Sequence, residues 1–397
     1  MSKVIVHIDL NMFFVRCEEI KDPSLVGKCV AIGHEGRSGI VSTCSYEARK
    51  YGVHSGMPMF QATKACKNLI IIPGDYKFYR VMSHSFISFL KRYTKLIEQA
   101  SIDECFCDFT EPLKGKKDVI QYFKDLQNSL YKETGLMCSI GVAPTKFLAK
   151  MGSDYKKPMG ITIIRKRDIP SILYPLDISQ MFGVGKKSVP RLKKMGINTI
   201  GDLKKRMDEH DENVINSFGK FYSTLEDWLN GKGDDTIDMN PWDPKSIGNS
   251  TTLPHDSDDI EEIKEYIYSL CMEVSKRAQD EDKIGSTIQV VIKDINFVSK
   301  NKSTTLETPT NSFKTIYARA IKLYEENFSG VNIRLVGVTL QNLVSKKDMT
   351  VQMTLFNYEE HENESQTKLL INELNRKLKK PSLKRASELE DEKDENR

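Results

Sequence analysis

The sequence lacks several features that would place it in a specialised class of protein. No apolar run approaches the ~18 residues of a membrane-spanning helix, and no leader of charged, apolar and small residues opens the chain. There is no C-x-x-C pair, no histidine at zinc-ligand spacing and no internal repeat of fixed period. We therefore expect a cytoplasmic protein with no membrane partner, whose eight cysteines are reduced thiols in the core, at positions 17, 29, 44, 66, 105, 107, 138 and 271.

Length and charge distribution indicate a multidomain protein with uneven charge. At 397 residues the chain is too long for one ordinary core, and about two to four domains are expected. The net charge of +4 conceals a segregation along the chain: residues 143–206 hold 15 Lys and Arg against 4 Asp and Glu, whereas residues 207–262 hold 3 against 15. The basic block is either an electrostatic footprint for nucleic acid or the solvated face of several helices.

Two short stretches far apart in the chain supply three carboxylates. V-I-V-H-I-D-L near the amino terminus contains Asp9, and A-S-I-D-E-C-F at 100–106 contains Asp103 and Glu104. Each carboxylate ends or interrupts a run of β-formers, where a loop at a strand end can hold acids together and still admit solvent, metal and substrate. Clustered carboxylates favour magnesium, because hard divalent cations prefer oxygen ligands. The alternative is three solvated acids in hairpin turns.

The order of predicted elements around these acids indicates a ferredoxin-like domain. A buried strand spans 1–10, a helix begins near residue 77, and the segment I-E-Q-A-S-I-D-E-C-F-C-D-F forms a strand pair. A second helix covers about 117–134, and strands follow at 137–142 and 160–164. This β-α-β-β-α-β order predicts that the acids lie on neighbouring central strands.

The rest of the chain divides where its patterns change. Between the first strand and the first helix we expect a hairpin turn at 33–39 and a strand at 40–44, and helical patterns dominate 168–231. A second α/β unit follows, with strands near 247–253, 285–298, 302–307 and 333–343 and helices near 258–280 and 312–327. The charged and polar end of the chain contains one amphipathic stretch, at 365–378.

Further motifs accompany the acids. After Asp9 the chain runs L-N-M-F-F-V-R-C-E-E, and later come S-T-C-S-Y-E-A-R-K-Y-G-V, S-I-G-V-A-P-T-K-F-L-A-K and D-Y-K-K-P-M-G. In order and spacing these motifs resemble the Y-family translesion DNA polymerases, most closely the DinB-like branch of bacteria and its archaeal relatives, over roughly residues 1–356.

The resemblance implies a multidomain α+β fold, that of a right-hand polymerase. The expected domains are a ferredoxin-like palm (1–10 and 77–166), small fingers (11–76), a helical thumb with a helix-hairpin-helix (167–233), a linker (234–246), an α/β little finger (247–347) and a flexible tail (348–397).

The resemblance also implies roles for the acids. Asp9 and Asp103 would bridge two Mg²⁺ ions, Glu104 would bind the catalytic ion, and the main-chain carbonyl of Leu10 would complete the nucleotide-side ion. The chemistry needs such ions in any case, because a primer 3′-hydroxyl is a poor nucleophile at neutral pH.

Three side chains stand where the family binds the triphosphate, namely Tyr46, Arg49 and Lys157. Arg49 can fork two oxygens, and Lys157 supplies a point charge. Taken singly, each has an ordinary explanation, either the start of an amphipathic helix or a solvated lysine before Pro158. Together with the acids they predict a nucleotide site.

Residues near these positions would shape the nucleotide pocket. Phe14 occupies the position of the family's steric gate, whose ring leaves no room for a 2′-hydroxyl. Of the adjacent pair Phe13 and Phe14, one ring is expected to belong to the core. Ile32, Ser42 and Cys44 would form a small roof over the nascent base pair, which leaves space for damaged bases at the expense of fidelity.

Two regions are candidates for DNA binding. The stretch D-I-S-Q-M-F-G-V-G-K-K-S-V-P-R-L-K-K-M-G-I at 177–197 resembles a helix-hairpin-helix, whose Gly183 and Gly185 would bring backbone amides to a phosphate beside Lys186 and Lys187. Such a contact is independent of base sequence. On the little finger, the candidates are Lys293, Lys300, Lys302 and Arg334, although exposed strand lysines also serve solubility.

A short peptide follows the last predicted domain. V-Q-M-T-L-F at 351–356 resembles the Q-x-x-L-F peptide by which bacterial polymerases dock on the sliding clamp. Leu355 and Phe356 would fill an apolar pocket, with Gln352 hydrogen-bonding at its rim.

Together these features predict a template-directed DNA polymerase of low fidelity that acts by two-metal phosphoryl transfer in damage tolerance. We expect a monomer whose partners are primer-template DNA, deoxynucleoside triphosphates and the sliding clamp. One alternative is a catalytically weak DNA- and clamp-binding adaptor of the same fold. Another is a different palm enzyme such as a nucleotidyl cyclase, which has no use for a helix-hairpin-helix or a clamp peptide.

Overall fold

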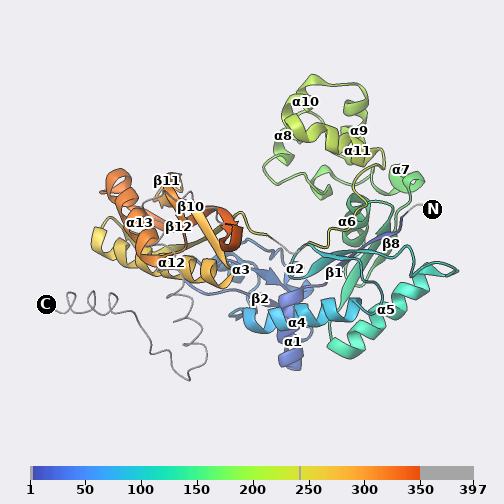
Figure 1. Ribbon diagram of the computed structural model, residues 1–397. Coiled ribbons are helices and arrows are strands. Elements are labelled where there is room, and N and C mark those ends of the chain that lie inside the picture. The colour runs from blue at the N-terminus through green and yellow to red at the C-terminus, as the bar shows by residue number, and fades with distance from the viewer. Residues whose placement is uncertain (1–2, 241–242, 349–397) are drawn as a thin grey trace. The chain divides into compact units, whose positions relative to one another are not determined.

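The computed structural model describes residues 3–240 and 243–348, and the chain divides into two compact units, Met1–Trp242 and Asp243–Arg397 (Figure 1). No helix in these described ranges is long and apolar enough to cross a membrane.

A five-stranded sheet forms the centre of the first unit, with strand order β5-β6-β1-β7-β8. Its strands are β1 (Ile5–Leu10), β5 (Ile97–Gln99), β6 (Glu104–Asp108), β7 (Cys138–Ala143) and β8 (Ile161–Ile163). Four helices accompany it, α1 (Phe13–Lys21), α4 (Tyr76–Leu90), α5 (Val119–Thr134) and α6 (Lys146–Tyr155). The β-α-β-β-α-β order is confirmed, and the acid-bearing strands β1 and β6 are neighbours.

Both faces of this sheet are covered, so all six residues of β1 are buried. Successive side chains of a strand point to opposite faces. Val6 and Ile8 belong to a core shared with α1, α4 and α5, whereas Ile5 belongs to a second core that includes residues of α6 and of the helices that follow it. His7 and Asp9 alternate with the first set and therefore face α6.

The sequence patterns did not predict α6, which connects the parallel strands β7 and β8. Its close approach to the sheet depends on Gly141 in β7, because a Cβ there would lie 1.9 Å from the Ala149 carbonyl oxygen and 2.4 Å from the Ser153 nitrogen. This contact brings the side chains of α6 within reach of β1.

Residues 23–72 contain a small three-stranded sheet with order β3-β2-β4. Its elements are β2 (Val30–Ile32), β3 (Thr43–Cys44), β4 (Ile70–Ile72), the 3₁₀ turn η1 (Pro23–Leu25) and the helices α2 (Tyr46–Arg49) and α3 (Met59–Ala65). The strand predicted at 40–44 is therefore shorter, because only its last two residues pair with β2. All eight cysteines are free and all but Cys29 are buried, as predicted.

Short helices make up residues 166–229, which confirms the helical pattern predicted there. They are η2 (Lys166–Asp168), α7 (Ile169–Ile172), η3 (Ile178–Gln180), α8 (Val189–Lys194), α9 (Ile200–Asp208), α10 (Glu212–Phe218), η4 (Gly219–Phe221) and α11 (Tyr222–Leu229). They share the second core with α6.

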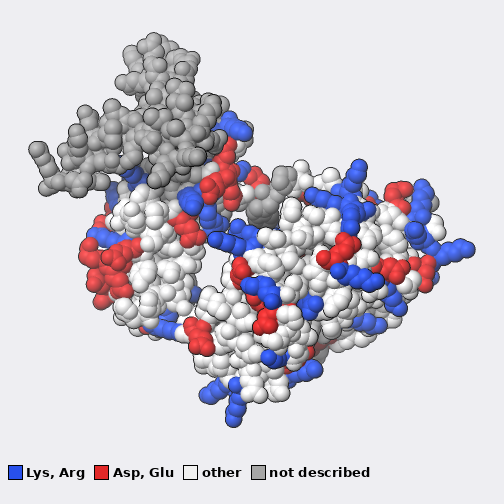
Figure 2. All heavy atoms as spheres, turned by 90° about the horizontal axis from the view of Figure 1, so that it is seen from below, with Lys and Arg blue, Asp and Glu red and all other residues white. Residues whose placement is uncertain are grey.

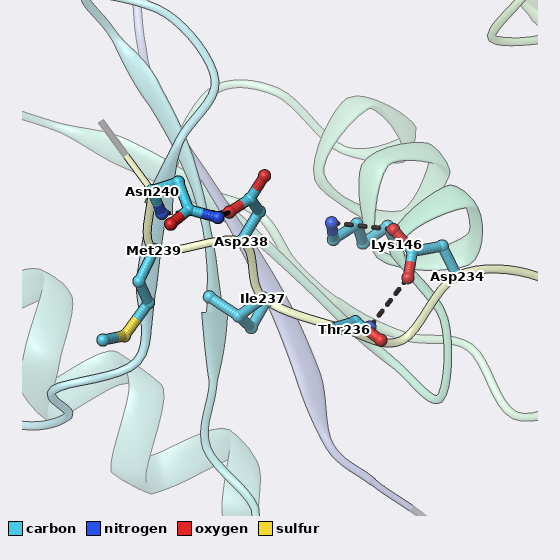
Figure 3. A pocket seen from close by; sticks show the side chains of 7 residues that line it. All are labelled: Lys146, Asp234, Thr236, Ile237, Asp238, Met239 and Asn240. Atoms are coloured by element: carbon cyan, nitrogen blue, oxygen red, sulfur yellow. Dashed lines mark hydrogen bonds and ion pairs between the residues drawn. The ribbon is translucent and has the colours of Figure 1, made fainter. Parts of the chain in front are cut away.

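The segment after these helices lies against α6 and β5. Lys146 on α6 binds the Asp234 carboxylate at 2.8 Å (Figure 3). It also binds the Glu98 carboxylate at 2.6 Å. The backbone nitrogen of Asp238 also donates to Glu98, at 2.6 Å. These contacts border a cavity of about 650 Å³. The first half of the predicted linker is therefore held on the first unit.

The second unit is an antiparallel sheet of order β11-β10-β12-β9 with two helices in one core. Its elements are β9 (Ser246–Ser257), α12 (Ile260–Asp280), β10 (Lys283–Asp294), β11 (Ser299–Thr310), α13 (Phe313–Phe328), β12 (Ile333–Ser345) and the turn η5 (Lys346–Asp348). The predicted order of strands and helices is confirmed. The amphipathic stretch at 365–378 lies outside the described residues.

Candidate active site

The three predicted acids meet at one end of β1 and β6. The register of these antiparallel strands places Asp9 opposite Glu104. Asp103 directly precedes β6, and its carbonyl oxygen accepts a hydrogen bond from the Leu10 nitrogen at 2.9 Å. The structure therefore brings together residues that the sequence separates by the three-stranded sheet and α4.

Two lysines contact the acids directly. Lys150 Nζ lies 3.1 Å from Asp9 Oδ2 and 2.6 Å from Glu104 Oε2, and Lys157 Nζ lies 2.7 Å from Asp9 Oδ1. Asp154 contacts both lysines, at 3.4 Å from Lys150 and 2.8 Å from Lys157. Burial alone would lower the pKa of Lys150, but the charges of Asp9 and Asp154 raise it above its ordinary value, so the ammonium stays protonated.

Glu104 is stabilised in its ionised form. Contacts with His7 and Lys150 hold the pKa of its carboxyl well below the usual range. The Lys150 contact is the shorter of the two, at 2.6 Å against 3.4 Å from His7 Nε2. Burial lowers the pKa of His7, which stays neutral while its Nδ1 lies 2.7 Å from Ser153 Oγ.

Asp103 has the opposite electrostatic environment. Burial and the nearby charges of Asp9 and Glu104 raise the pKa of its carboxyl, although the Ser101 hydroxyl donates to Oδ1 at 2.6 Å. The three acids are thus not equivalent: Glu104 has cationic and polar partners, whereas Asp103 is held near like charges.

This donor set fits a hard divalent cation. Within the described part of the chain, His7, Asp9 and Glu104 form a group whose candidate ligand atoms all lie within 4.8 Å of one another. Carboxylate oxygens are ligands of Mg²⁺. Asp103 is not in this closest group, but it lines the adjacent pocket.

A pocket of about 260 Å³ opens beside the acids. The predicted nucleotide residues gather there although they come from three distant segments. Its lining residues are Asp9, Leu10, Asn11, Met12, Phe13, Phe14, Ser42, Thr43, Tyr46, Arg49, Ser55, Asp103 and Lys157. The Arg49 guanidinium lies over the Tyr46 ring, 4.8 Å from its centroid.

The two adjacent phenylalanines have different surroundings. Phe13 is only 3% exposed, which confirms that one ring belongs to the core. Phe14 is half-buried and stacks on Tyr79, with ring centroids 4.4 Å apart. Of the three roof residues, Ser42 lines the pocket, whereas Ile32 and Cys44 are fully buried.

Sequence reasoning missed the residues that support these side chains. His7, Lys150 and Ser153 surround Glu104 and Asp9, and Asn11 accepts a hydrogen bond at 2.8 Å from the nitrogen of Met159, close to Lys157. Lys150 belongs to the motif T-K-F-L-A-K, but only the missing helix α6 would have placed it over β1.

Family models and curated relatives match most of the chain. Residues 8–154 match the impB/mucB/samB family, 166–197 the IMS family HHH motif and 244–355 the impB/mucB/samB family C-terminal domain. The chain is 37% identical to DNA polymerase IV of Bacillus velezensis, over 100% of this chain and 95% of that protein. It is 38% identical to DNA polymerase IV 1 of Bacillus subtilis, over 98% and 94% respectively.

A solved structure agrees with these matches. The Y-family DNA polymerase chimera Dbh-Dpo4(243-245)-Dbh has a TM-score of 0.77 at 26% identity, and the match covers 86% of this chain and 99% of that one. The chain belongs to the Y family of DNA polymerases. The predicted fold class is thereby confirmed, including the helix-hairpin-helix.

In this Y-family polymerase the helix-hairpin-helix residues are accessible. Gly183 has φ +89°, a conformation that favours glycine, and a Cβ on Gly185 would meet open space. Lys186 and Lys187 are exposed and have no ion-pair partner within residues 3–240 and 243–348. Figure 2 shows basic and acidic side chains interspersed over much of the face that it presents.

The four basic residues predicted to bind DNA in the polymerase's second unit differ in exposure and in their partners. Lys300 and Lys302 are exposed on β11, and Lys293 is half-buried on β10. Arg334 has a different partner from the phosphate predicted for it: its guanidinium makes two hydrogen bonds to Asp256, at 3.0 and 2.9 Å, and lies 4.4 Å from the Phe297 ring centroid. The predicted clamp peptide, Gln352–Phe356, lies outside the described residues.

Proposed function

We propose that this Y-family enzyme is a translesion DNA polymerase that adds deoxynucleotides to a primer 3′ end in the pocket between palm and fingers, with two Mg²⁺ ions as cofactors. The observation that carries the proposal is the single pocket that two of the predicted acids, Asp9 and Asp103, share with the triphosphate-binding cations and the steric gate, with Glu104 paired to Asp9 in the sheet. The sequence features of the adaptor alternative are present too, but the complete acid set favours catalysis.

The residues of this chain would hold the cofactor as follows. Asp9 and Asp103 would hold both ions, Glu104 would hold the catalytic ion, and the Leu10 carbonyl would hold the nucleotide-side ion. When bound, the ions supply Lewis-acid stabilisation of the attacking and leaving oxygens. The antiparallel register of β1 and β6 holds Asp9 and Glu104 side by side, so little reorganisation of the backbone is needed.

The cationic wall of the pocket would bind the triphosphate. The planar Arg49 guanidinium can contact two phosphate oxygens, and its stacking on Tyr46 limits its orientations. Lys157 is a point charge that also lines the pocket, and its loop is held by Asn11 through the Met159 nitrogen.

Phe14 would select the sugar. Its ring lines the pocket and is supported from behind by the buried Tyr79, so it resists displacement by a larger substrate. Ser42 is the one roof residue at the pocket surface, and its small side chain leaves room above the base pair.

The enzyme would act as a monomer on primer-template DNA. The exposed helix-hairpin-helix and the lysines of β10 and β11 would contact the DNA backbone, and Gln352, Leu355 and Phe356 would dock on the sliding clamp. Exposure of Lys186, Lys187, Lys300 and Lys302 supports the backbone contacts.

Primer extension with purified full-length protein tests the proposal. We expect Asp103→Ala and Glu104→Ala to abolish extension while primer-template affinity stays near wild type. Glu111→Ala removes an exposed acid outside the pocket and is the matched control. Extension close to the wild-type rate in either site variant would contradict the catalytic assignment, and absence of extension by the wild type with retained DNA binding would favour the adaptor.

A further inference from the structure

Lys150 lies within the acid cluster but has no role in the reaction proposed above. Its side chain is only 14% exposed, and its Nζ bridges Asp9 Oδ2 and Glu104 Oε2, at 3.1 and 2.6 Å. It reaches them from α6, which lies on the sheet because Gly141 leaves room. The ammonium thus stands between the two carboxylates that would share a divalent cation.

We propose that Lys150 is an internal counter-ion, a positioning residue that bridges Asp9 and Glu104 in the metal-free enzyme and moves onto Asp154 when a divalent cation binds. The inference rests on the proposed role of Asp9 and Glu104 as metal ligands. Mg²⁺ binds oxygens at about 2.0–2.1 Å. A cation at that distance from both oxygens occupies the space of the ammonium, so the two exclude each other.

The bridging contact has a physical purpose in the absence of metal. Two partly buried carboxylates without a cation repel each other and lose hydration. The Lys150 ammonium reduces the repulsion and replaces part of the lost hydration through its contact with Glu104 Oε2, and His7 Nε2 lies 3.4 Å from the same oxygen. The acid pair therefore keeps its geometry before the cofactor arrives.

Asp154 provides the alternative partner. It lies one helical turn after Lys150, 3.4 Å from its Nζ, and its side chain is 42% exposed. Because the two residues share α6, a change of side-chain rotamer is enough to transfer the ammonium from the acids to Asp154. Lys157 also contacts Asp9 and Asp154, but it lines the pocket and is assigned to the triphosphate.

The test is Mn²⁺ binding to the full-length, nucleotide-free protein, followed by electron paramagnetic resonance. Lys150→Gln removes the competing ammonium. We expect the affinity for Mn²⁺ to rise at least about threefold, because the ion no longer has to break the contacts of Lys150 with Asp9 and Glu104 in order to bind. The metal-free variant should have a lower melting temperature than the wild type, and saturating Mn²⁺ should raise its melting temperature by more than it raises that of the wild type. Asp9→Asn, which should abolish this binding, identifies the site.

Two further variants separate competition from general charge effects. Lys156→Gln removes the same charge from an exposed neighbouring position that contacts no carboxylate within the described ranges, and should bind Mn²⁺ like wild type. Lys150→Arg keeps the cation and should bind Mn²⁺ no more tightly than wild type. It also keeps the test decisive if Lys150→Gln does not fold.

The outcomes distinguish the inference from the function on which it rests. If wild-type protein shows no Mn²⁺ binding that depends on Asp9, the metal-ligand assignment fails and the counter-ion role fails with it. If wild type binds Mn²⁺ but Lys150→Gln has equal or weaker affinity, or Lys150→Arg binds more tightly than wild type, only the counter-ion role is overturned.

Discussion

Asp103 and Glu104 are adjacent in sequence but have opposite electrostatic surroundings. Contacts with His7 and Lys150 lower the pKa of Glu104 to about 2, whereas burial and the neighbouring acids raise the pKa of Asp103. If only the repulsion among the three acids mattered, replacing either Asp103 or Glu104 by a neutral residue would leave the folded protein stable. The contacts indicate instead that the two carboxylates contribute to stability with opposite sign.

We therefore expect Glu104→Gln to lower, and Asp103→Asn to raise, the free energy of unfolding of the metal-free protein at pH 7, each by on the order of 1 kcal/mol, with the melting temperature changing in the same direction. Ionised Glu104 stabilises the folded state above its ordinary pKa of about 4.5, and this contribution is lost as the pH falls toward 2. Ionised Asp103 is disfavoured in the folded state, so its cost appears only as the pH rises above about 3.8. Thermal melts in EDTA between pH 7 and pH 4 measure the difference, and equal melting temperatures at pH 7 would refute it.

Phe14 is expected to select the sugar, whereas the adjacent Phe13 packs in the core. Phe14→Ala removes bulk from the pocket wall without touching an acid, so ribonucleotide incorporation should rise roughly tenfold or more while deoxynucleotide incorporation falls modestly. Phe60→Ala removes an exposed aromatic ring from the fingers and should change neither. Single-nucleotide incorporation assays measure both substrates, and unchanged discrimination in Phe14→Ala would make this residue part of the core only.

At the scale of elements, α6 determines which polar residues meet the acids. Its packing depends on Gly141, where even a methyl group would overlap the Ala149 carbonyl oxygen. Gly141→Ala should destabilise the protein by about 1–3 kcal/mol and lower the extension rate, because α6 must shift with Lys150 and Ser153. Gly141→Val should have a larger effect. Thermal unfolding and primer extension measure the series, and wild-type stability of Gly141→Ala would show that α6 does not need this close contact.

The helix-hairpin-helix is the element expected to contact the DNA backbone. Replacing Lys186 and Lys187 by Gln should reduce the slope of log binding constant against log salt concentration by about one unit for each lost contact. The matched control replaces Lys91 and Lys95, two exposed lysines that follow α4. Fluorescence anisotropy over a salt series measures the slopes. An unchanged slope in the Lys186/Lys187 variant would show that these two lysines do not contact the DNA backbone. A slope near zero in wild type would contradict backbone binding altogether.

At the scale of the whole molecule, the tail is expected to connect the enzyme to its clamp. Replacing Leu355 and Phe356 by Ala should leave single-nucleotide incorporation intact and remove stimulation by a loaded clamp, because tethering raises effective concentration at the primer end and not the rate of chemistry. Replacing Leu369 and Leu370 removes another apolar pair of the tail as a control. Processivity assays measure the effect, and full stimulation of the first variant would place the docking peptide elsewhere.

The sequence by itself determined the family, the order of elements and the acids. Strand alternation, helical periodicity and the spacing of Asp9, Asp103 and Glu104 are local properties of the chain, and β1, α4, β6, α12 and β12 follow from them. Phe13, Phe14, Tyr46, Arg49 and Lys157 could likewise be assigned to the pocket because each belongs to a motif of recognisable order.

Only the tertiary structure decided what surrounds these residues. The helix α6 was not predicted, although the parallel strands β7 and β8 need a crossover connection. The contacts of its residues Lys150 and Ser153 with β1 were therefore not predicted either. The sequence offers Arg334 as a candidate for binding a DNA phosphate, but in the structure its guanidinium binds Asp256, which is 78 residues away in the chain. Partners of this kind, including those that separate the pKa of Asp103 from that of Glu104, depend on distances between distant segments, which no local pattern contains.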